Sequence, residues 1–174
     1  MFKKRIFFSL IAVFIFFVAG LTTGLASSKY IFHIKRNKNK NIVQYSIRYD
    51  KDSCTPTGQK PIYVYWRNLE VSPTDTESIH FWEQPAYGIK SQKVIGNKVE
   101  IHLKALPTKK IVTDFVKSKG KCSINSTVQI NGSQGIIKEI YVFAKEGLVL
   151  PTVVYIDIIG WDLKQKTIKE RIFK

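Results

Sequence analysis

The sequence predicts an all-β protein, either an antiparallel β-sandwich or a partly closed barrel, with about ten strands and one short helix. Three observations favour this class. Apolar and polar residues alternate with period two along most of the chain, helical periodicity is rare, and two-residue turns of Gly and Asn separate successive runs. The 174 residues, 44% hydrophobic and 24% charged, suffice for one buried core. This composition excludes collagen-like, low-complexity and wholly disordered chains.

The first predicted element is a secretory signal peptide over residues 1–26. Three basic residues precede an apolar run, and Gly24 and Ala26 place small residues on the amino-terminal side of a cleavage site. The alternative is an uncleaved membrane anchor, because the 21 residues from 6 to 26 could nearly span a bilayer. We therefore expect an exported protein, periplasmic or extracellular, with a single β-rich domain over residues 27–174.

The predicted strands are runs rich in β-branched and aromatic side chains, with Gly, Pro, Asn or Asp near their ends. The alternation is clearest in residues 43–49, where Val43 and Tyr45 share one face. Gly96-Asn97 and Asn131-Gly132 predict tight hairpins, because these residues readily adopt positive φ. In order, the strands cover residues 30–36, 43–49, 62–67, 87–95, 99–104, 111–116, 124–130, 136–143, 152–159 and 167–173.

One segment departs from the alternation and predicts the short helix. Ser72 and Pro73 are residues typical of a helix start, so we expect a helix over residues 75–82. This helix would pack Ile79 and Trp82 against the core. The strands on either side of each turn are expected to pair antiparallel.

Cys54 and Cys122 are the two cysteines of the chain, and both follow the leader. An even pair in an exported domain predicts one disulfide, with two unpaired thiols as the alternative. Closing a loop with 67 residues between the cysteines would contribute about 4 kcal/mol in the chain-entropy model. The residues around Cys54 have turn chemistry, which argues against an immunoglobulin-type pair of cysteines in strands.

The chain is strongly basic. Its formal net charge is +15, and +12 remains when the three basic residues of the leader are removed. Six basic residues and no acid lie between residues 27 and 49, and the favoured interpretation of this cluster is a solvated surface that maintains solubility. The alternative is a patch that binds an anionic envelope component or an acidic protein. Lysines number 23 and arginines 5, which argues against nucleic acid, and a membrane would be met only through an uncleaved leader or surface charge.

Short motifs along the chain resemble, in their order, those of an uncharacterised bacterial family. In chain order these motifs are residues 33–41, Tyr65-Trp66, Glu83, Ala86-Tyr87-Gly88, Ile130-Asn131-Gly132, residues 151–160 and Glu170. On these motifs the chain resembles domain-of-unknown-function family 4833 over nearly all of its length after the leader. The resemblance implies an exported or envelope domain without assigned chemistry.

Asp157 is the most informative single residue. It lies in a strand that is apolar on both sides, where an unpaired carboxylate would carry a large desolvation cost. We expect Arg36 or His33 to be its partner, because Arg can hold a carboxylate through two parallel hydrogen bonds. The pair would fix the register of the strands, and a ligand-binding carboxylate is the alternative.

Aromatic and asparagine side chains complete the candidate ligand-binding site. Tyr63 and Tyr65 are expected on one face of their strand and Trp66 on the other, and such rings suit stacking on sugars. Packing in the core or at its rim is the commoner role of such rings and the favoured interpretation here. The candidate residues are His33, Arg36, Asn39, Asn41, Tyr65, Trp66, Tyr87 and Asp157.

The sequence contains no recognised catalytic or metal-binding motif. Its three histidines do not show the spacing of a local metal site, and nucleophile motifs and phosphate-binding glycine loops are lacking. We therefore expect no catalytic residue, no metal and no cofactor, and a domain that binds an anionic or glycan-like partner without catalysis. One alternative is a hydrolase of unrecognised type using His80, Glu83 or Asp157. The other is a structural or assembly protein that pairs through a sheet edge.

Overall fold

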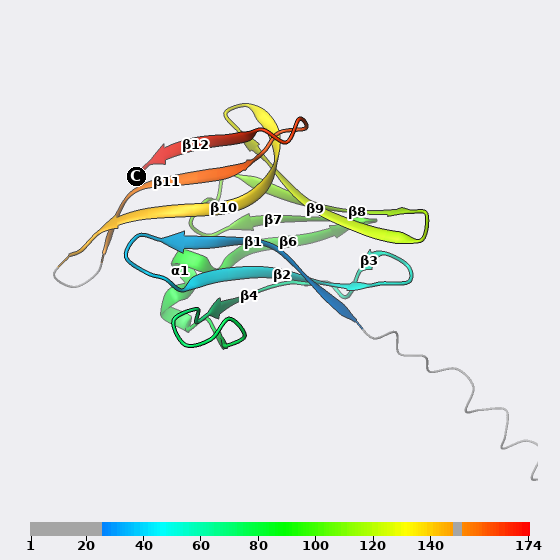
Figure 1. Cartoon of the computed structure of the whole chain (residues 1–174), viewed down its shortest axis with the longest axis horizontal. Coiled ribbons are helices and arrows are strands. Elements are labelled where there is room, and N and C mark those ends of the chain that lie inside the picture. Colours follow the sequence, from blue (N-terminus) through cyan, green and yellow to red (C-terminus); the bar gives the residue numbers. More distant parts are fainter. Residues whose placement is uncertain (1–25, 148–150) are drawn as a thin grey trace, which may run out of the picture.

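The computed structural model describes residues 26–147 and 151–174 (Figure 1), so nearly all of the predicted leader lies outside the described residues. In chain order the elements are β1 (Ser27–Arg36), β2 (Ile42–Asp50), β3 (Thr55–Pro56), β4 (Ile62–Arg67), β5 (Thr76–Ser78), the 3-10 helix η1 (Phe81–Glu83), α1 (Gln84–Tyr87), β6 (Ile89–Ile95), β7 (Lys98–Leu103), β8 (Lys110–Ser118), β9 (Lys121–Ile130), β10 (Ser133–Lys145), β11 (Thr152–Trp161) and β12 (Thr167–Phe173). The all-β prediction is confirmed. The two strands beyond the expected ten are the very short β3 and β5.

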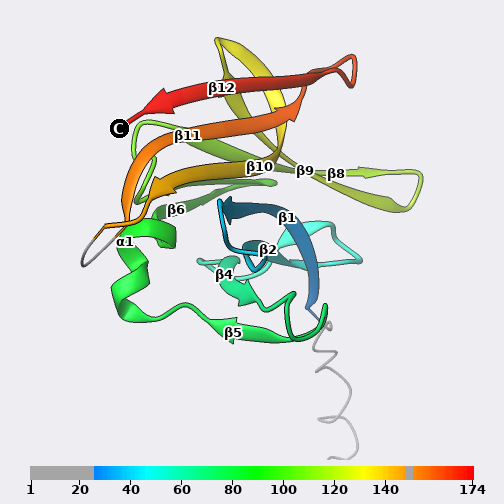
Figure 2. The same cartoon turned by 60° about the vertical axis from the view of Figure 1, so that its left-hand side comes forward.

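The strands form one sheet that is not closed into a barrel. Its order is β5-β4-β2-β1-β10-β9-β8-β7-β6, with β11 and β12 branching from β10 and β3 from β2. Figure 2 shows β12, β11 and β10 side by side above β1, β2 and β4. β10 is the junction of the sheet, because β9 and then β1 pair along one edge of it and β11 pairs along the other.

The pairs of strands in the described chain are antiparallel, except that β1 and β10 run parallel. In this parallel pair His33 lies opposite Glu139. A parallel pair needs a long connection, and here most of the chain lies between the two strands. The antiparallel prediction therefore holds for the hairpins and misses the pair that joins the amino-terminal strands to the carboxyl-terminal ones.

The core lies between two layers of the folded sheet. Phe32 of β1 and Tyr45 of β2 are fully buried, and their rings stack with centroids 4.5 Å apart. Ile101 of β7 and Ile111 of β8 contribute to the same buried cluster from the other layer. In β7 buried and less buried residues alternate along the strand, as the sequence pattern predicts.

β6, at one end of the sheet, is joined to β4, next to the other end, by a side chain rather than by backbone pairing. The Gln92 amide nitrogen of β6 donates to the Ile62 carbonyl of β4 at 2.7 Å, and the Ile62 N–H donates to the Gln92 side-chain oxygen at 3.0 Å. An amide side chain can replace a peptide group in this way because it carries the same donor and acceptor. Gln92 therefore links β4 to β6 where the sheet stays open.

Positive-φ residues form the tight turns that the sequence predicts. Gly96 has φ +54° in the β6–β7 turn, and Asn131 and Gly132 have φ +49° and +78° in the β9–β10 turn. These values suit the primed hairpin turns that match the twist of the strands. Lys119 and Gly120, with φ +49° and +74°, form a further turn of this kind between β8 and β9 that the sequence interpretation did not identify.

The predicted helix over residues 75–82 is wrong in its position. Residues 76–78 form β5, in which Ser78 lies opposite Tyr65 of β4, and the helical segments begin only at Phe81. The hydrogen bond from the Asn68 side chain to Asp75, at 2.8 Å, helps to hold this chain along β4. Ile79 packs against the core as expected, but Trp82 is 61% exposed instead of packing inward.

The predicted strand over residues 87–95 begins later than expected. α1 includes Tyr87, and β6 starts at Ile89. The Gly88 N–H donates to the Gln84 carbonyl at 2.8 Å, which ends the helix before the strand begins. The helical turn thus takes the first residue that the pattern assigns to the strand.

The two cysteines form the predicted disulfide. Cys54 lies in the turn after β2 with φ +58°, and its Cα is 5.4 Å from that of Cys122 at the start of β9. The turn position of Cys54 confirms the argument against an immunoglobulin-type pair, and the bond itself is compatible with an oxidising compartment. No helix in residues 26–147 or 151–174 has the length and apolar character needed to cross a membrane.

Candidate functional site

The eight candidate residues lie in three separate places, and all of them are described by the structure. Arg36, Asn39 and Asn41 lie at the turn between β1 and β2. Trp66 and Tyr87 pack together against the core, with ring centroids 5.3 Å apart in an edge-to-face arrangement. His33, Tyr65 and Asp157 occupy strand positions whose neighbours face the core, so they lie on the outer face of the sheet. The predicted residues therefore do not form one site.

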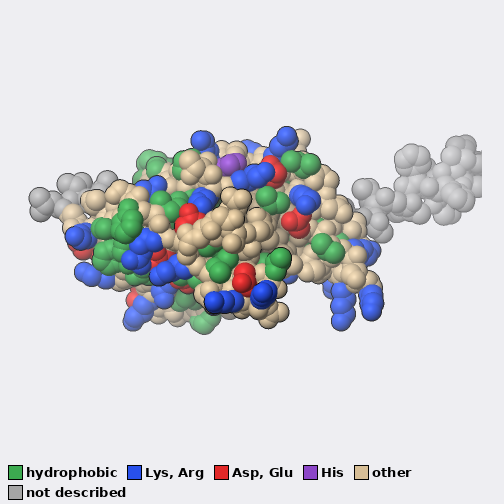
Figure 3. Space-filling model, turned by 90° about the horizontal axis from the view of Figure 1, so that it is seen from above, with side chains coloured by type: hydrophobic (Ala, Val, Ile, Leu, Met, Phe, Trp, Pro, Cys, Tyr) green, Lys and Arg blue, Asp and Glu red, His purple; other side chains and the backbone are tan. Residues whose placement is uncertain are grey.

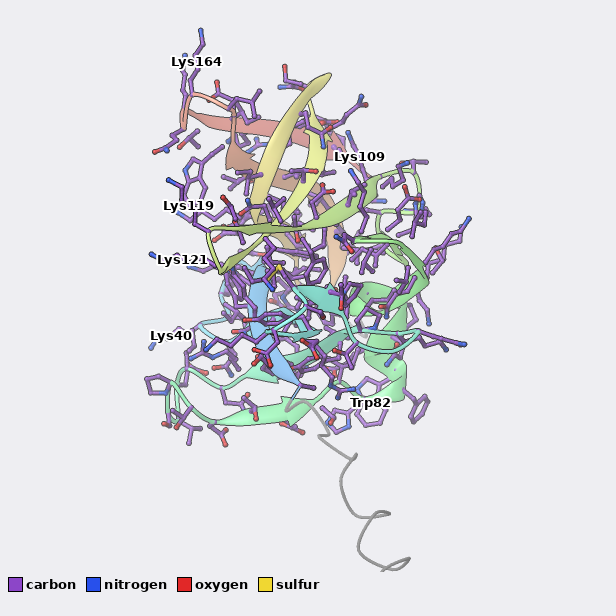
Figure 4. All side chains as sticks on the ribbon, turned by 90° about the vertical axis from the view of Figure 1, so that its right-hand side faces the viewer. Lys40, Trp82, Lys109, Lys119, Lys121 and Lys164 are labelled. Atoms are coloured by element: carbon purple, nitrogen blue, oxygen red, sulfur yellow. A yellow bond between two sulfur atoms is a disulfide. The ribbon has the colours of Figure 1, made fainter. Side chains whose placement is uncertain are left out.

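A pocket of about 420 Å³ lies at the turn between β1 and β2. Its walls are formed by the four cations Lys35, Arg36, Lys38 and Lys40, the acid Glu70, the ring of Tyr141 and two asparagines of the turn. We call this feature the turn pocket. Lys40, one of the lining residues, is labelled in Figure 4. The volume of the pocket is in the range of about 300–1,000 Å³ that small-molecule sites occupy.

The asparagines of this turn hold the backbone in place. The Asn37 side chain donates to the Ala144 carbonyl at 2.9 Å and accepts from the Ala144 N–H at 2.8 Å. The side-chain oxygen of Asn39 accepts from the Asn41 N–H at 2.9 Å, and that of Asn41 accepts from the Glu70 N–H at 3.1 Å. These bonds fix the turn against β10 and against the segment after β4. They thereby hold the backbone that carries the pocket cations.

The turn pocket has an excess of positive charge. Lys40 and Glu70 are 3.9 Å apart and Arg36 and Glu146 are 3.8 Å apart, and these side chains are largely exposed or half-buried. Such surface pairs are weak. Among the described residues, no carboxylate lies within 4.0 Å of the ammonium of Lys35. The lining of the pocket therefore carries more positive than negative charge.

His33 is held on the outer face between two partners. Its Nε2 is 3.0 Å from a Glu139 carboxylate oxygen, and its Nδ1 is 2.7 Å from the Tyr30 hydroxyl. Burial lowers the pKa of His33, although the Glu139 carboxylate acts in the opposite direction. Burial also raises the pKa of Tyr30 to about 12. His33 is thus a partner of Glu139, and the predicted pair of His33 with Asp157 is wrong.

Asp157 has the buried, paired position that the sequence predicts, but its partner is Arg171. Nε and a terminal nitrogen of Arg171 donate to the two carboxylate oxygens at 2.7 and 2.8 Å, and Lys169 Nζ lies 3.5 Å away. These hydrogen bonds hold the pKa of Asp157 below its usual value, against the effect of burial. Arg171 lies opposite Asp157 in the β11–β12 hairpin, so the nearer hairpin strand supplies the cation instead of Arg36.

The sequence held a signal for this pair. The strands predicted for residues 152–159 and 167–173 meet at a short connection, and a symmetric hairpin around that connection places residue 157 opposite Lys169, two residues from the observed partner Arg171. Lys35 and Lys38 of the turn pocket belong to the basic cluster that the sequence shows in residues 27–49, whereas Tyr141 had no comparable signal. Tyr141 is brought beside Lys35 by the parallel β1–β10 pair, which no local pattern predicts.

Tyr65 and Trp66 point to opposite faces of β4, as predicted. The Tyr65 hydroxyl is hydrogen-bonded to the Gln44 amide nitrogen and lies 3.1 Å from the Ser46 hydroxyl on the outer face. On the inner face, the Trp66 indole N–H donates to the Glu83 carboxylate, with 3.0 and 3.1 Å to its two oxygens. These contacts make both residues part of the scaffold beside the helical turn.

The residues of the alternative hydrolase reading do not assemble. The Glu83 carboxylate accepts from the His80 N–H at 2.8 Å and from the indole of Trp66, whereas Asp157 lies in β11 with Arg171. No group of three or more His, Cys, Asp or Glu side chains that could hold a metal ion occurs among the described residues. The arrangement in these residues is one of paired scaffold groups.

Comparison with known families assigns the chain. The family model described as Domain of unknown function (DUF4833) matches residues 32–171. The chain belongs to this family. No curated protein and no solved structure matches this chain.

The DUF4833 motifs recognised in the sequence meet in the structure. Glu170 accepts from the Asn131 N–H at 2.8 Å and from Lys109 Nζ at 2.7 Å. These hydrogen bonds lower the pKa of Glu170, although burial acts to raise it. Trp66, Glu83 and Tyr87 form the second meeting point described above. The motifs therefore mark contacts between distant elements of the fold.

Proposed function

We propose that this DUF4833 domain is an exported, non-catalytic binding domain that holds an anionic glycan of the cell envelope in the turn pocket. The observation that carries the proposal is the composition of the pocket, in which four cations and one acid surround about 420 Å³. Anions are attracted to a concave surface lined by one sign of charge. Export is supported by the predicted leader and by the Cys54–Cys122 disulfide.

The lysines of the pocket suit a polymer with repeated anionic groups. A lysine ammonium is a mobile point charge, whereas the planar fork of arginine suits one fixed carboxylate or phosphate. Three of the four pocket cations are lysines. Tyr141 adds a ring and a hydroxyl to the pocket, which suit the apolar face and the hydroxyl groups of a sugar. An anionic glycan fits both features better than a simple ion.

The experiment compares a pocket variant with a variant of equal charge. Lys35→Gln, Arg36→Gln and Lys38→Gln together remove three pocket cations. Lys119→Gln, Lys121→Gln and Lys164→Gln remove three exposed cations elsewhere (Figure 4). Binding of a heparin oligosaccharide is measured by calorimetry at physiological ionic strength. We expect the pocket variant to lose about tenfold or more in affinity, which is about 1.4 kcal/mol, and the control to lose much less.

Three outcomes would contradict the proposal. Equal losses in the two variants would show attraction to overall charge rather than to the turn pocket. Binding of poly-glutamate with no binding of the oligosaccharide would indicate an acidic protein as partner. Binding only to phosphatidylglycerol vesicles would indicate a lipid surface.

A further inference from the structure

A second charged feature lies in residues 75–87, which comprise β5, η1 and α1. This segment contains three acids, Asp75, Glu77 and Glu83, and no Lys or Arg, in a chain whose net charge is +15. We call it the acidic knob. Its charge is opposite to that of the turn pocket, where four cations face one acid.

The acidic knob exposes two large aromatic side chains. Phe81 is 81% exposed and Trp82 is 61% exposed. The rings of His80 and Trp82 stack with centroids 4.4 Å apart, and Phe81 meets Trp82 edge-on at 4.9 Å. Trp is enriched among the residues that carry most of the energy at protein interfaces. A cluster of exposed aromatics on a protein surface marks a contact site.

The cluster is held rigidly before any partner arrives. The Glu83 carboxylate caps the turn by accepting from the His80 N–H at 2.8 Å. It also accepts from the indole N–H of Trp66, which lies on the inner face of β4. His80 Nε2 lies 3.0 Å from Glu77. A surface that is already ordered loses less conformational entropy when it binds. The backbone that carries the two rings is therefore held by hydrogen bonds at His80 and Glu83.

The acids of the knob have no lysine or arginine partner among the described residues. Asp75 accepts from the Asn68 side chain, Glu77 contacts His80, and Glu83 is bonded to an indole and a backbone N–H. None of these partners carries the fixed positive charge of a lysine or an arginine. The negative charge of the knob is available to a basic surface.

We propose that the acidic knob of one copy docks into the turn pocket of a second copy. Lys and Arg side chains bind both to carboxylates and to the faces of Trp rings, so the pocket cations match both components of the knob. Figure 4 places Lys40 and Trp82 on opposite sides of the molecule, so the aromatic end of the knob does not reach the pocket of its own copy. The contact is therefore head-to-tail, and it can extend to further copies because it leaves a free knob and a free pocket at the ends.

The first test is self-association of the protein measured by sedimentation velocity over a range of concentrations. The wild-type mass rises with concentration at physiological ionic strength and falls back in high salt, because exposed charge pairs are screened. The variant Phe81→Ala with Trp82→Ala stays monomeric. The matched control, Trp161→Ala with Phe173→Ala, removes the same two residue types from exposed positions in β11 and β12 and keeps the wild-type behaviour.

The second test uses complementation. The knob variant and the pocket variant (Lys35→Gln, Arg36→Gln and Lys38→Gln) each stay monomeric alone. Mixed together they form a one-to-one complex, because one copy supplies an intact knob and the other an intact pocket. A mixture that stays monomeric, or a wild type that stays monomeric at all concentrations, would overturn the inference. Vesicle binding that depends on Trp82 without any rise in protein mass would overturn it in favour of a lipid partner.

This inference uses the turn pocket on which the proposed function also rests, and the two can fail separately. The knob variant keeps the affinity of the wild type for the heparin oligosaccharide if the pocket binds anions as proposed. Loss of self-association with retained oligosaccharide binding supports both proposals. Retained self-association in the knob variant contradicts the head-to-tail contact and leaves the glycan proposal standing.

Discussion

His33 occupies the place where β1 and β10 run parallel, between Tyr30 and Glu139. The neutral imidazole satisfies both neighbours when Nε2–H donates to the Glu139 carboxylate and Nδ1 accepts from the Tyr30 hydroxyl. A protonated ring has to donate from Nδ1, so the Tyr30 hydroxyl has to turn its proton elsewhere. The Lys138 carbonyl, 3.3 Å from that hydroxyl, is the acceptor at hand. This geometry and the burial both favour the neutral ring.

We expect the free energy of unfolding to fall on mild acidification because of His33. The pKa of His33 in the folded protein is lowered from 6.5 by burial. Below pH 6.5 the unfolded chain therefore binds a proton more readily than the folded protein does, and unfolding is favoured. The contribution is complete above that pH and is lost as the pH falls towards the lowered folded value. Urea unfolding at a series of pH values between about 8 and 5 measures the slope.

The control separates His33 from the other histidines. His33→Gln removes the titrating ring while keeping a donor for Glu139, and we expect it to flatten the decrease in stability over this range. His102→Gln leaves His33 in place and keeps the wild-type slope. Equal losses of stability in His33→Gln and the wild type would exclude His33 as the source of the pH dependence.

At the scale of single residues, the sequence predicts well that a buried charged group needs a partner. It predicts the identity of that partner less well. The burial of Asp157 follows from the apolar residues around it, and the need for a cation follows from the cost of an unpaired carboxylate. The choice of Arg171 over Arg36 depends on the register of a hairpin. The exposure of Trp82 had no local signal, because a tryptophan in an amphipathic segment ordinarily packs inward.

Among the secondary-structure elements, the hairpins were predicted and the segment after β4 was not. Glycine and asparagine with positive φ fix the β6–β7 and β9–β10 turns locally, so the sequence suffices for them. Residues 76–78 become a strand because the edge of β4 lies beside them, which is a contact from elsewhere in the chain. Local helix propensity alone favours a helix at these residues, and the pairing with β4 outweighs it.

The close approach of β10 and β11 explains one residue of the family motif. A Cβ added to Gly160 would lie 2.4 Å from the Ile136 carbonyl oxygen and 2.9 Å from Ile130 Cδ1. The backbone oxygen cannot move away without disturbing the β10–β11 pair. A glycine is therefore required where β11 crosses the bulge of its partner strand.

The seam between β4 and β6 depends on one side chain, and this gives a prediction. Gln92→Ala removes both hydrogen bonds to the backbone of Ile62, a residue that is only 2% exposed. The Ile62 N–H and carbonyl then lose these partners. We expect the variant to lose about 1–3 kcal/mol of unfolding free energy. Urea unfolding measures this loss, and faster amide hydrogen exchange at Ile62 places it at the seam.

A second glutamine provides the matched control for the seam. Gln129 lies exposed in β9, so Gln129→Ala should change the unfolding free energy by less than about 0.5 kcal/mol. Gln92→Glu retains the acceptor for the Ile62 N–H and loses the donor for its carbonyl. Equal stabilities for Gln92→Ala and Gln129→Ala would show that the side chain does not join β4 to β6.

For the whole molecule, charge is distributed unevenly in a way that composition cannot show. Lys and Arg side chains are scattered among hydrophobic ones over the face seen in Figure 3, whereas residues 75–87 carry three acids and no Lys or Arg. The excess of lysine predicts a basic surface. The β4–β6 connection begins beside the β1–β2 turn, where Glu70 contacts Lys40 and Asn41, and it then carries Trp82 to the other side of the molecule.

The Cys54–Cys122 disulfide joins the two layers of the folded sheet, since Cys54 follows β2 and Cys122 begins β9. The cysteines are separated by 68 residues in sequence, so the bond excludes many extended conformations of the unfolded chain. We expect Cys54→Ser with Cys122→Ser to lose about 4 kcal/mol of unfolding free energy. Reductant should lower the urea midpoint of the wild type to that of the double variant and leave the variant unchanged. Both should unfold in one transition, because residues from the two layers share a single buried cluster. If complete reduction left the urea midpoint of the wild type unchanged, the disulfide would not stabilise the fold by restricting the unfolded chain.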